Sequence, residues 1–133
     1  MNQTQTDLEK LKAWLATYPD WEYCPPDVIP KALEEISRQA DVLGNTLVVH
    51  RYTFSLLWQR AGQADAGIDA QGLLDFQRWV SAQCSAGLCP QFGDVPAFER
   101  LRLEKGGFTL NTQAVTYTVT LLADFLKIYE VSR

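Results

Sequence analysis

The sequence predicts an α+β fold in which two helices pack on one face of a mainly antiparallel four-stranded sheet. Two segments repeat apolar residues at the spacing of a helix, and three alternate apolar and polar residues as half-buried strands do. With one further segment assigned as a hairpin arm, the order along the chain is α-β-β-α-β-β. The chain has 133 residues, 47% of them hydrophobic, so we expect a single domain spanning 1–133.

The first predicted helix begins near Thr6 and ends before Pro19. Thr6 and Glu9 have the spacing of a capping box, in which each side chain satisfies a free backbone N–H at the helix start. Proline disfavours helical geometry in the residue before it, so Pro19 ends the helix. One helix face is apolar and consists of Leu8, Leu11, Leu15 and Tyr18.

The first hairpin is expected after a proline-rich extended connector over 21–30. Residue propensities in 31–40 favour a helix, but the turn-like Gly44-Asn45 pair and a strong strand follow, so we predict a strand there. The second arm spans 46–58. One of its faces carries Val48, His50, Tyr52, Phe54, Leu56 and Trp58, and the other carries Arg51, Thr53 and Ser55.

The second helix is predicted over about 70–86, with Asp69 as its N-cap. Ile68 can then close a hydrophobic staple on Leu73. Gly87 supplies the C-terminal stop. The predicted buried face is formed by Leu73, Phe76, Val80 and Cys84, with Trp79 alongside.

Two strands finish the predicted fold. Alternation indicates a strand over 98–105, after which Gly106-Gly107 permits a turn, a bulge or a loose loop. The clearest alternation spans 114–121. We expect this strand to continue to about Tyr129, with a bulge near Leu122, where the alternation changes phase.

The charge distribution argues against two classes of partner. Twelve Lys and Arg against sixteen Asp and Glu give a net charge of −4, and the basic residues are scattered. Nucleic-acid binders concentrate positive charge, so no specific nucleic-acid binding is expected. The acidic balance, and the lack of any apolar run near twenty residues, argue against a membrane partner. The polar N-terminus lacks the apolar core of a signal peptide, which predicts the cytoplasm or particles assembled there.

The cysteines and the histidine form no recognisable catalytic or metal-binding set. Cys24, Cys84 and Cys89 include no CxxC pair, and His50 completes no familiar zinc spacing with them, so we interpret them as reduced, partly buried thiols. A histidine on the apolar face of a strand is more often a hydrogen-bonded core residue than a catalyst. The competing interpretation makes His50 a general base for Cys84 or Cys89, but no motif supports it.

Paired carboxylates offer no better case for catalysis. Glu34 and Glu35 are adjacent on a predicted strand and therefore point to opposite faces. Asp65 and Asp69 bracket a helix start, where capping and the helix dipole explain them. Glycine motifs that cradle phosphates are absent. We therefore predict a protein that is not an enzyme, with no catalytic, cofactor-binding or metal-binding residues and no cofactor.

Five segments, in order, cover most of the chain and carry a family resemblance: 11–21, 41–60, 73–94, 98–106 and 117–130. With these the chain resembles phage and prophage minor capsid proteins, whose fold and role are similar to those of the tail terminator and tail-completion proteins of long-tailed phages. The resemblance implies a homohexameric ring that caps the tail tube and receives the head, as a virion component assembled in the host cytoplasm. It transfers no individual functional residue.

Ring closure requires two different surface patches on each subunit. We hypothesise that the loops 61–69, 88–97 and 106–113 supply part of them. Trp14 and Trp21 either mark a partner surface or cover the sheet, and the second interpretation is favoured. Two other functions stay open. One is a head-completion or connector subunit, and the other, of a different class, is a small-molecule-binding domain with a cleft near His50.

Overall fold

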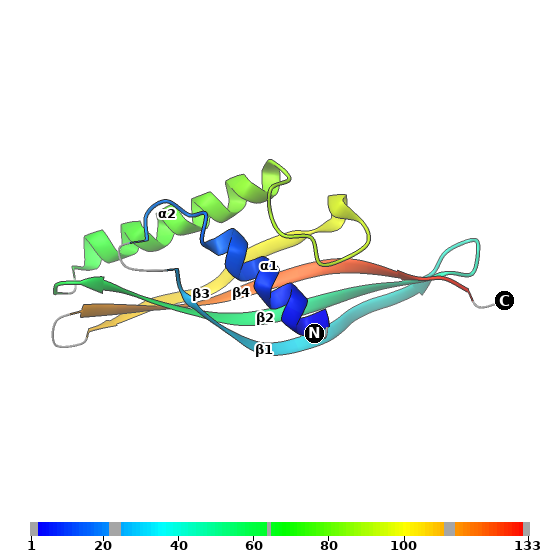
Figure 1. Ribbon diagram of the computed structural model, residues 1–133, viewed down its shortest axis with the longest axis horizontal. Helices are drawn as coiled ribbons and strands as arrows, with labels where there is room; N and C mark the ends of the chain where they lie inside the picture. The colour runs from blue at the N-terminus through cyan, green and yellow to red at the C-terminus, as the bar shows by residue number, and fades with distance from the viewer. Residues whose placement is uncertain (1–2, 22–24, 64, 111–113, 132–133) are drawn as a thin grey trace.

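The computed structural model describes residues 3–21, 25–63, 65–110 and 114–131 and consists of a layer of helices on one face of an antiparallel sheet (Figure 1). This confirms the predicted α+β class. The elements are α1 (Gln3–Leu15), β1 (Asp27–Ala40), β2 (Thr46–Ala61), α2 (Ala66–Ser85), the short 3₁₀ helix η1 (Pro96–Phe98), β3 (Arg100–Leu110) and β4 (Ala114–Tyr129). Across the sheet the strands lie in the order β1-β2-β4-β3, and each neighbouring pair is antiparallel.

The central strands β2 and β4 pair without interruption, from Thr46 opposite Tyr129 to Ala61 opposite Ala114. The predicted bulge near Leu122 is therefore wrong. Leu122 is only 5% exposed although it lies on the face opposite the helices, so the apparent phase change reflects a strand that is buried on both faces there. The irregularity lies in β3 instead, between Leu103 and Lys105.

Helix α1 begins at Gln3, so Thr6 lies inside it and the predicted capping box is wrong. Its last helical residue is Leu15, and Tyr18 lies in the turn that follows, where its side chain is still buried. The predicted apolar face is confirmed, because Leu11 and Leu15 are fully buried. Trp14 ties this helix to α2, since its indole N–H donates to Gln83 Oε1 at 3.0 Å.

Helix α2 begins earlier than expected, because Asp65 is the N-cap and its carboxylate accepts from the backbone N–H groups of Gly67 and Ile68. The predicted N-cap at Asp69 and the staple from Ile68 are wrong, since both residues lie inside the helix and Ile68 is 57% exposed. The C-terminal stop is confirmed. Gly87 has a φ of +73° and its N–H donates to Cys84 O, a conformation that favours glycine.

Two predicted connectors belong to strands. Strand β1 begins at Asp27 and contains Pro30, which an edge strand tolerates because one row of its backbone groups has no partner strand. Gly106-Gly107 lies inside β3, which runs on to Leu110. At Gly106 a Cβ atom would lie 3.7 Å from the Leu73 side chain of α2, an ordinary van der Waals contact, so the strand continues here without requiring glycine.

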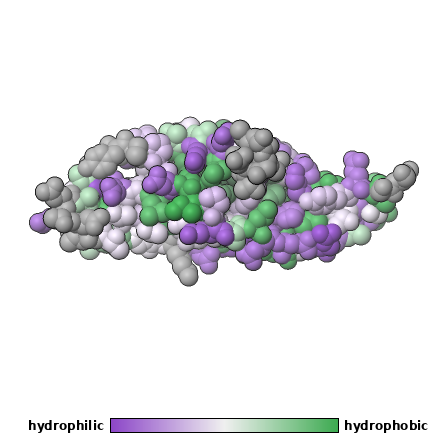
Figure 2. Space-filling model, turned by 60° about the horizontal axis from the view of Figure 1, so that its bottom comes forward, coloured by the Kyte–Doolittle hydropathy of each residue, from purple (hydrophilic) through white to green (hydrophobic). Residues whose placement is uncertain are grey.

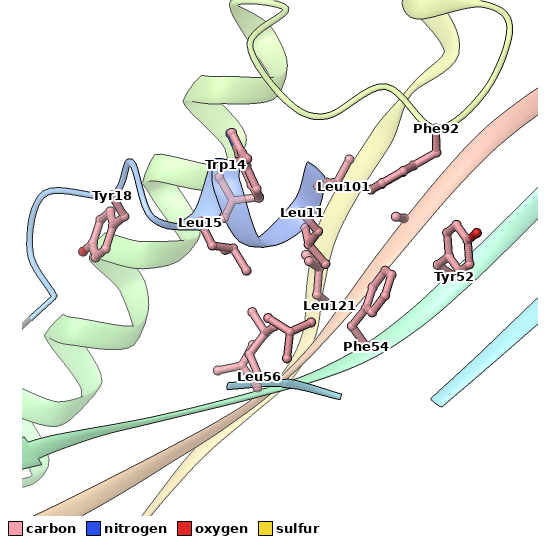
Figure 3. Packing of buried hydrophobic residues seen from close by; sticks show 14 of the residues in the cluster. Leu11, Trp14, Leu15, Tyr18, Tyr52, Phe54, Leu56, Phe92, Leu101 and Leu121 are labelled. Atoms are coloured by element: carbon pink, nitrogen blue, oxygen red, sulfur yellow. The ribbon is translucent and has the colours of Figure 1, made fainter. Parts of the chain in front are cut away.

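The core lies between the sheet and the two helices (Figure 3). Aromatic rings from both layers pack edge to face, as for Trp58 of β2 against Phe76 of α2 at 5.2 Å between centroids, and such pairs add to the stabilisation from burial alone. The members that are at most 1% exposed are Leu11, Leu15, Phe54, Leu56, Phe76, Val80, Val119, Leu121 and Ala123.

The loop between α2 and β3 replaces a strand beside β4. Strand β3 pairs with β4 only as far as Arg100 opposite Asp124. Beyond that point the Asp94 N–H donates to Leu126 O, and the Ile128 N–H donates to the Asp94 carboxylate, both at 2.8 Å. The loop thus covers backbone groups that β3 leaves without a partner strand.

This docking requires glycine at position 93, where a Cβ atom would lie 2.4 Å from Leu126 O. We expect Gly93→Ala to lower the free energy of unfolding by about 2 kcal/mol, because a backbone carbonyl cannot move aside cheaply. Gly107→Ala is the control, since no atom lies within 4 Å of its Cβ position and a change within about 1 kcal/mol is expected. Urea unfolding of both variants measures the difference, and equal losses would contradict the explanation.

Candidate functional site

His50 lies at the margin of the core. It is on the helix-bearing face of β2, but the side chain is only half-buried, so the expectation of a core histidine is wrong. Its ring stacks on Phe125 at 5.3 Å between centroids, and the Tyr129 hydroxyl lies 3.4 Å from Nε2. The alternation of the strand identified the face, but not how much of the side chain the rest of the fold covers.

A shallow depression of about 140 Å³ surrounds His50. At its base the Tyr52 hydroxyl donates to the buried Asp7 carboxylate. Pockets for small organic ligands typically begin at about 300 Å³, so the depression is small for the small-molecule alternative. Its remaining lining residues are Leu33, Phe92, Phe125, Lys127 and Tyr129.

The two described cysteines line a different cavity, of about 320 Å³, which Glu99 also lines. Cys84 and Cys89 are free thiols and half-buried, and His50 is not among the residues around them. Burial, with the Cys84 thiol as a neighbour, raises the pKa of Cys89 to about 12, so this thiol stays protonated and a poor nucleophile at neutral pH. The structure therefore does not bring together the imidazole–thiol pair. Cys24 lies outside the described residues.

Glu99 is a buried carboxylate that the sequence analysis missed, because nothing in its local pattern separates it from an exposed strand residue. It is 6% exposed, and Oε1 accepts from the N–H groups of Phe92 and Gly93 at 2.9 and 2.7 Å. Oε2 has no hydrogen-bond partner among the described residues. Burial raises the pKa of Glu99 despite these two bonds, and the carboxylate fixes the loop before β3.

Asp69 forms a buried ion pair rather than half of a catalytic dyad. Arg60 Nε lies 2.8 Å from Oδ1, the Tyr117 hydroxyl donates to the same oxygen, and the Asp65 N–H donates to Oδ2. The Arg60 hydrogen bond, together with that of Tyr117, holds the pKa of Asp69 at about 2 although burial opposes ionisation. Because its neighbour Asp65 serves as the N-cap, the two carboxylates have separate structural roles.

Glu34 and Glu35 lie on opposite faces of β1, as predicted. Glu35 lies 2.6 Å from Arg38, and Glu34 is directly opposite Arg51 of β2 on the helix-free face. Trp14 and Trp21 pack against the core, which confirms that they cover the sheet. Trp14 is 7% exposed, and the Trp21 indole N–H donates to a carbonyl at the end of α1.

One end of the sheet extends beyond the helices (Figure 1). We call this end the arm, which comprises residues 33–43 together with 46–51 and 124–131. Eleven large apolar side chains are exposed among the described residues, and seven of them belong to the arm: Leu33, Ile36, Val42, Leu43, Ile128, Tyr129 and Val131. In the space-filling view, hydrophobic residues lie among hydrophilic ones along the molecule, including this tapered end (Figure 2). The seven side chains lie on both faces of the arm, because Ile128 and Tyr129 follow one another along β4 and point to opposite faces. Exposed apolar side chains gathered at one end of a fold are a feature of interaction surfaces.

The helix-free face of the sheet is polar at its centre. Arg51 and Asp124 form a two-pronged ion pair there, with distances of 2.7 Å from Nε to Oδ1 and 3.0 Å from Nη2 to Oδ2. On the same face, alternation places hydroxyl side chains along the two strands on one side of this pair: Thr53, Ser55, Thr116, Thr118 and Thr120.

Comparisons of the chain with protein-family models, with curated proteins and with solved structures each found no match. Within the described residues, no group of three or more His, Cys, Asp or Glu side chains could hold a metal ion. Neither described helix has the length and apolar character needed to cross a membrane.

The Asp69 ion pair gives a stability prediction. Asp69→Asn should lower the free energy of unfolding by about 3 kcal/mol at pH 7, because Arg60 loses the buried carboxylate that neutralises it. The control is Asp75→Asn on the same helix, whose carboxylate is half-exposed, with an expected change below about 1 kcal/mol. Urea unfolding of both variants checks the difference.

The same pair predicts a pH dependence. The folded pKa of Asp69, about 2, lies below its ordinary value of 3.8, so its contribution is complete above pH 4 and is lost as the pH falls toward 2. The stability gap between the native chain and Asp69→Asn should narrow over that window. Unfolding curves at pH 7, 4 and 2.5 measure it, and a gap that is constant with pH would show that Asp69 is not the group responsible.

Proposed function

We propose that this chain is a structural subunit of a phage particle, a tail terminator or tail-completion protein that forms a homo-oligomeric ring at the joint between tail and head. The observation that carries the proposal is the arm, with its seven exposed apolar side chains. A monomer in water leaves this surface uncovered, whereas a ring subunit buries it against a neighbour, the tail tube or the head-completion protein.

The arm is a stiff projection. Strands β2 and β4 continue into it without a register shift, and the Asp41 carboxylate accepts the Leu43 and Asn45 N–H groups in the turn at its tip. A pre-ordered surface loses little conformational entropy on binding, so its apolar side chains contribute more of their burial energy to association. This property suits a protein that acts by geometry and affinity, without turnover.

The resemblance also implies a domain in which two helices pack on an antiparallel sheet, and the architecture of this chain is compatible with that. The hydroxyl-rich face without helices also supports the proposal. Its central Arg51 is paired with Asp124, and Arg100 and Arg102 share the face with Glu34, so the face carries mixed charge rather than a positive stripe that would hold DNA phosphates. A polar, weakly binding surface is what the lumen of a DNA-conducting ring requires, and the net charge of −4 is compatible with it.

Only part of the three segments predicted as exposed loops at the ring surface is loop in the structure. Residues 66–69 belong to α2 and 106–110 to β3, while 111–113 lie outside the described residues. The segment 93–94 is hydrogen-bonded to the edge of β4, so its polar groups are already used there. The remaining loop residues stay candidates, but the arm offers more exposed apolar surface than any of them.

Disruption of this gene in its host tests the proposal. We expect electron microscopy to show filled heads separate from tails that are overlong or unattached, with recovery when the native gene is supplied in trans. Tails of normal length beside heads that fail to retain DNA would instead assign the chain to head completion. Intact, infectious particles without the gene would overturn both assignments.

Substitutions in the arm refine this test. The double change Val42→Asp and Leu43→Asp alters two side chains that are 102% and 72% exposed, so the free energy of unfolding should stay within about 0.5 kcal/mol of its native value. We expect the variant nevertheless to fail in restoring infectious particles, because charge replaces the apolar contact. Leu74→Asp on α2, at a side chain 47% exposed, is the control and should restore them. Equal recovery by both variants would remove the arm from the interface.

A further inference from the structure

We infer that neighbouring copies of this chain meet edge to edge, with β3 of one copy beside β1 of the next and Arg100 opposite Glu34. The inference rests on the ring proposed above and identifies the surfaces that close it. Strands β1 and β3 are the two edges of the described sheet, so each copy presents two different edges. Contacts between different edges repeat head to tail, as ring closure requires.

The strand directions permit this contact. Because every neighbouring pair in the order β1-β2-β4-β3 is antiparallel, the two edge strands run in opposite directions. Placing β3 beside β1 of a second copy therefore continues the antiparallel pattern and keeps the helices of both copies on the same side of the sheet.

A row of charges crosses the helix-free face from one edge to the other. The register aligns four residues from β1 to β3: Glu34, Arg51, Asp124 and Arg100. Their signs alternate, beginning with an acid at the β1 edge and ending with a base at the β3 edge. In the proposed contact the row continues without a break in alternation, because Arg100 of one copy faces Glu34 of the next.

The two ends of this row have no ion-pair partner within the described chain. The central Arg51 and Asp124 bind each other, whereas the ion pairs among described residues include neither Glu34 nor Arg100. Arg100 donates only to the backbone carbonyls of Ala97 and Glu99, and both end residues are exposed. Each copy therefore carries an exposed acid without an ion pair at the β1 edge and an exposed base without an ion pair at the β3 edge.

Register shifts in both edge strands limit the length of regular strand that is available for the contact, and the two regular stretches lie at the same level of the sheet. Strand β1 has register shifts between Pro30 and Ala32 and between Glu35 and Ser37, which leaves a regular stretch over 32–35. Strand β3 has its shift after Leu103, which leaves 100–103 regular. Across the sheet, three residues of one stretch align with three of the other: 32 with 102, 33 with 101 and 34 with 100. Bulges and an edge proline oppose open-ended strand pairing, so the contact is short and its register is defined.

The shared rows match in side-chain character as well. Register through β2 and β4 places Leu33 in the row of Leu101 and Ala32 in the row of Arg102. Leu33 is 51% exposed in the single chain and would be covered by the neighbouring β3 edge.

Disulfide trapping between full-length chains tests the contact. One chain carries Ala32→Cys and the other Arg102→Cys, and one of them has an affinity tag so that mixed and like pairs differ in mass. Directly opposed residues bring their Cβ atoms to about 5 Å, near disulfide range. Under mild oxidation we expect mixed pairs to form faster than pairs of either variant alone, and faster than the background from the native cysteines.

Charge reversal decides whether the row directs this pairing. Adding Glu34→Arg to the first chain, or Arg100→Glu to the second, should slow mixed trapping about tenfold, and adding both should restore it. The matched reversals Glu9→Arg and Arg78→Glu lie on exposed helix positions and should leave the rate unchanged.

Three results would overturn the inference: no trapping above background, equal trapping by Ala32→Cys alone, or no recovery in the double reversal. The trapping experiment uses purified chains, so its failure would leave the particle phenotype to decide the proposed function separately. Intact particles after gene disruption would contradict the proposed role in the virion, but they would not contradict the contact between β1 and β3 of neighbouring copies.

Discussion

The structure depends on the unbroken pairing of β2 with β4, two strands of 16 residues each. Because no residue interrupts this pairing, one face of both strands stays apolar over its whole helix-covered length and both helices pack on that face. The same regularity carries the strands beyond the helices into the arm. The edge strands, by contrast, contain every register shift in the sheet. A rigid centre with irregular edges gives a stable domain whose contacts with other chains are local and specific.

Much of the fold could be predicted from the sequence, because it follows from local patterns. Alternation identified β2 and β4, and the spacing of Leu11 and Leu15 identified the buried face of α1. The start of α2 could not be predicted in the same way. Asp65 and Asp69 both suit an N-cap, and the choice depends on Arg60 and Tyr117, the second of which is 48 residues away from Asp69. Long-range pairing of this kind leaves no local signal.

The candidate surface was harder to predict than the fold. Alternation placed His50 on the correct face of β2, but only the extent of the helical layer determines that it is half-exposed. The row from Glu34 to Arg100 depends on the order of strands across the sheet, which the sequence pattern does not contain. The arm could not be distinguished from an ordinary hairpin, since its apolar residues match those of a strand that packs against a helix.

The arrangement of the tryptophans determines what optical spectroscopy can detect. All four belong to the layer between helices and sheet, where Trp14 stacks on Trp79 at 4.8 Å and Trp21 meets Trp58 at 5.2 Å between centroids. Intrinsic fluorescence therefore reports separation of the helices from the sheet. The arm contains no tryptophan, so emission is insensitive to events there, and a chain that joins a larger assembly through the arm keeps the spectrum of the free subunit.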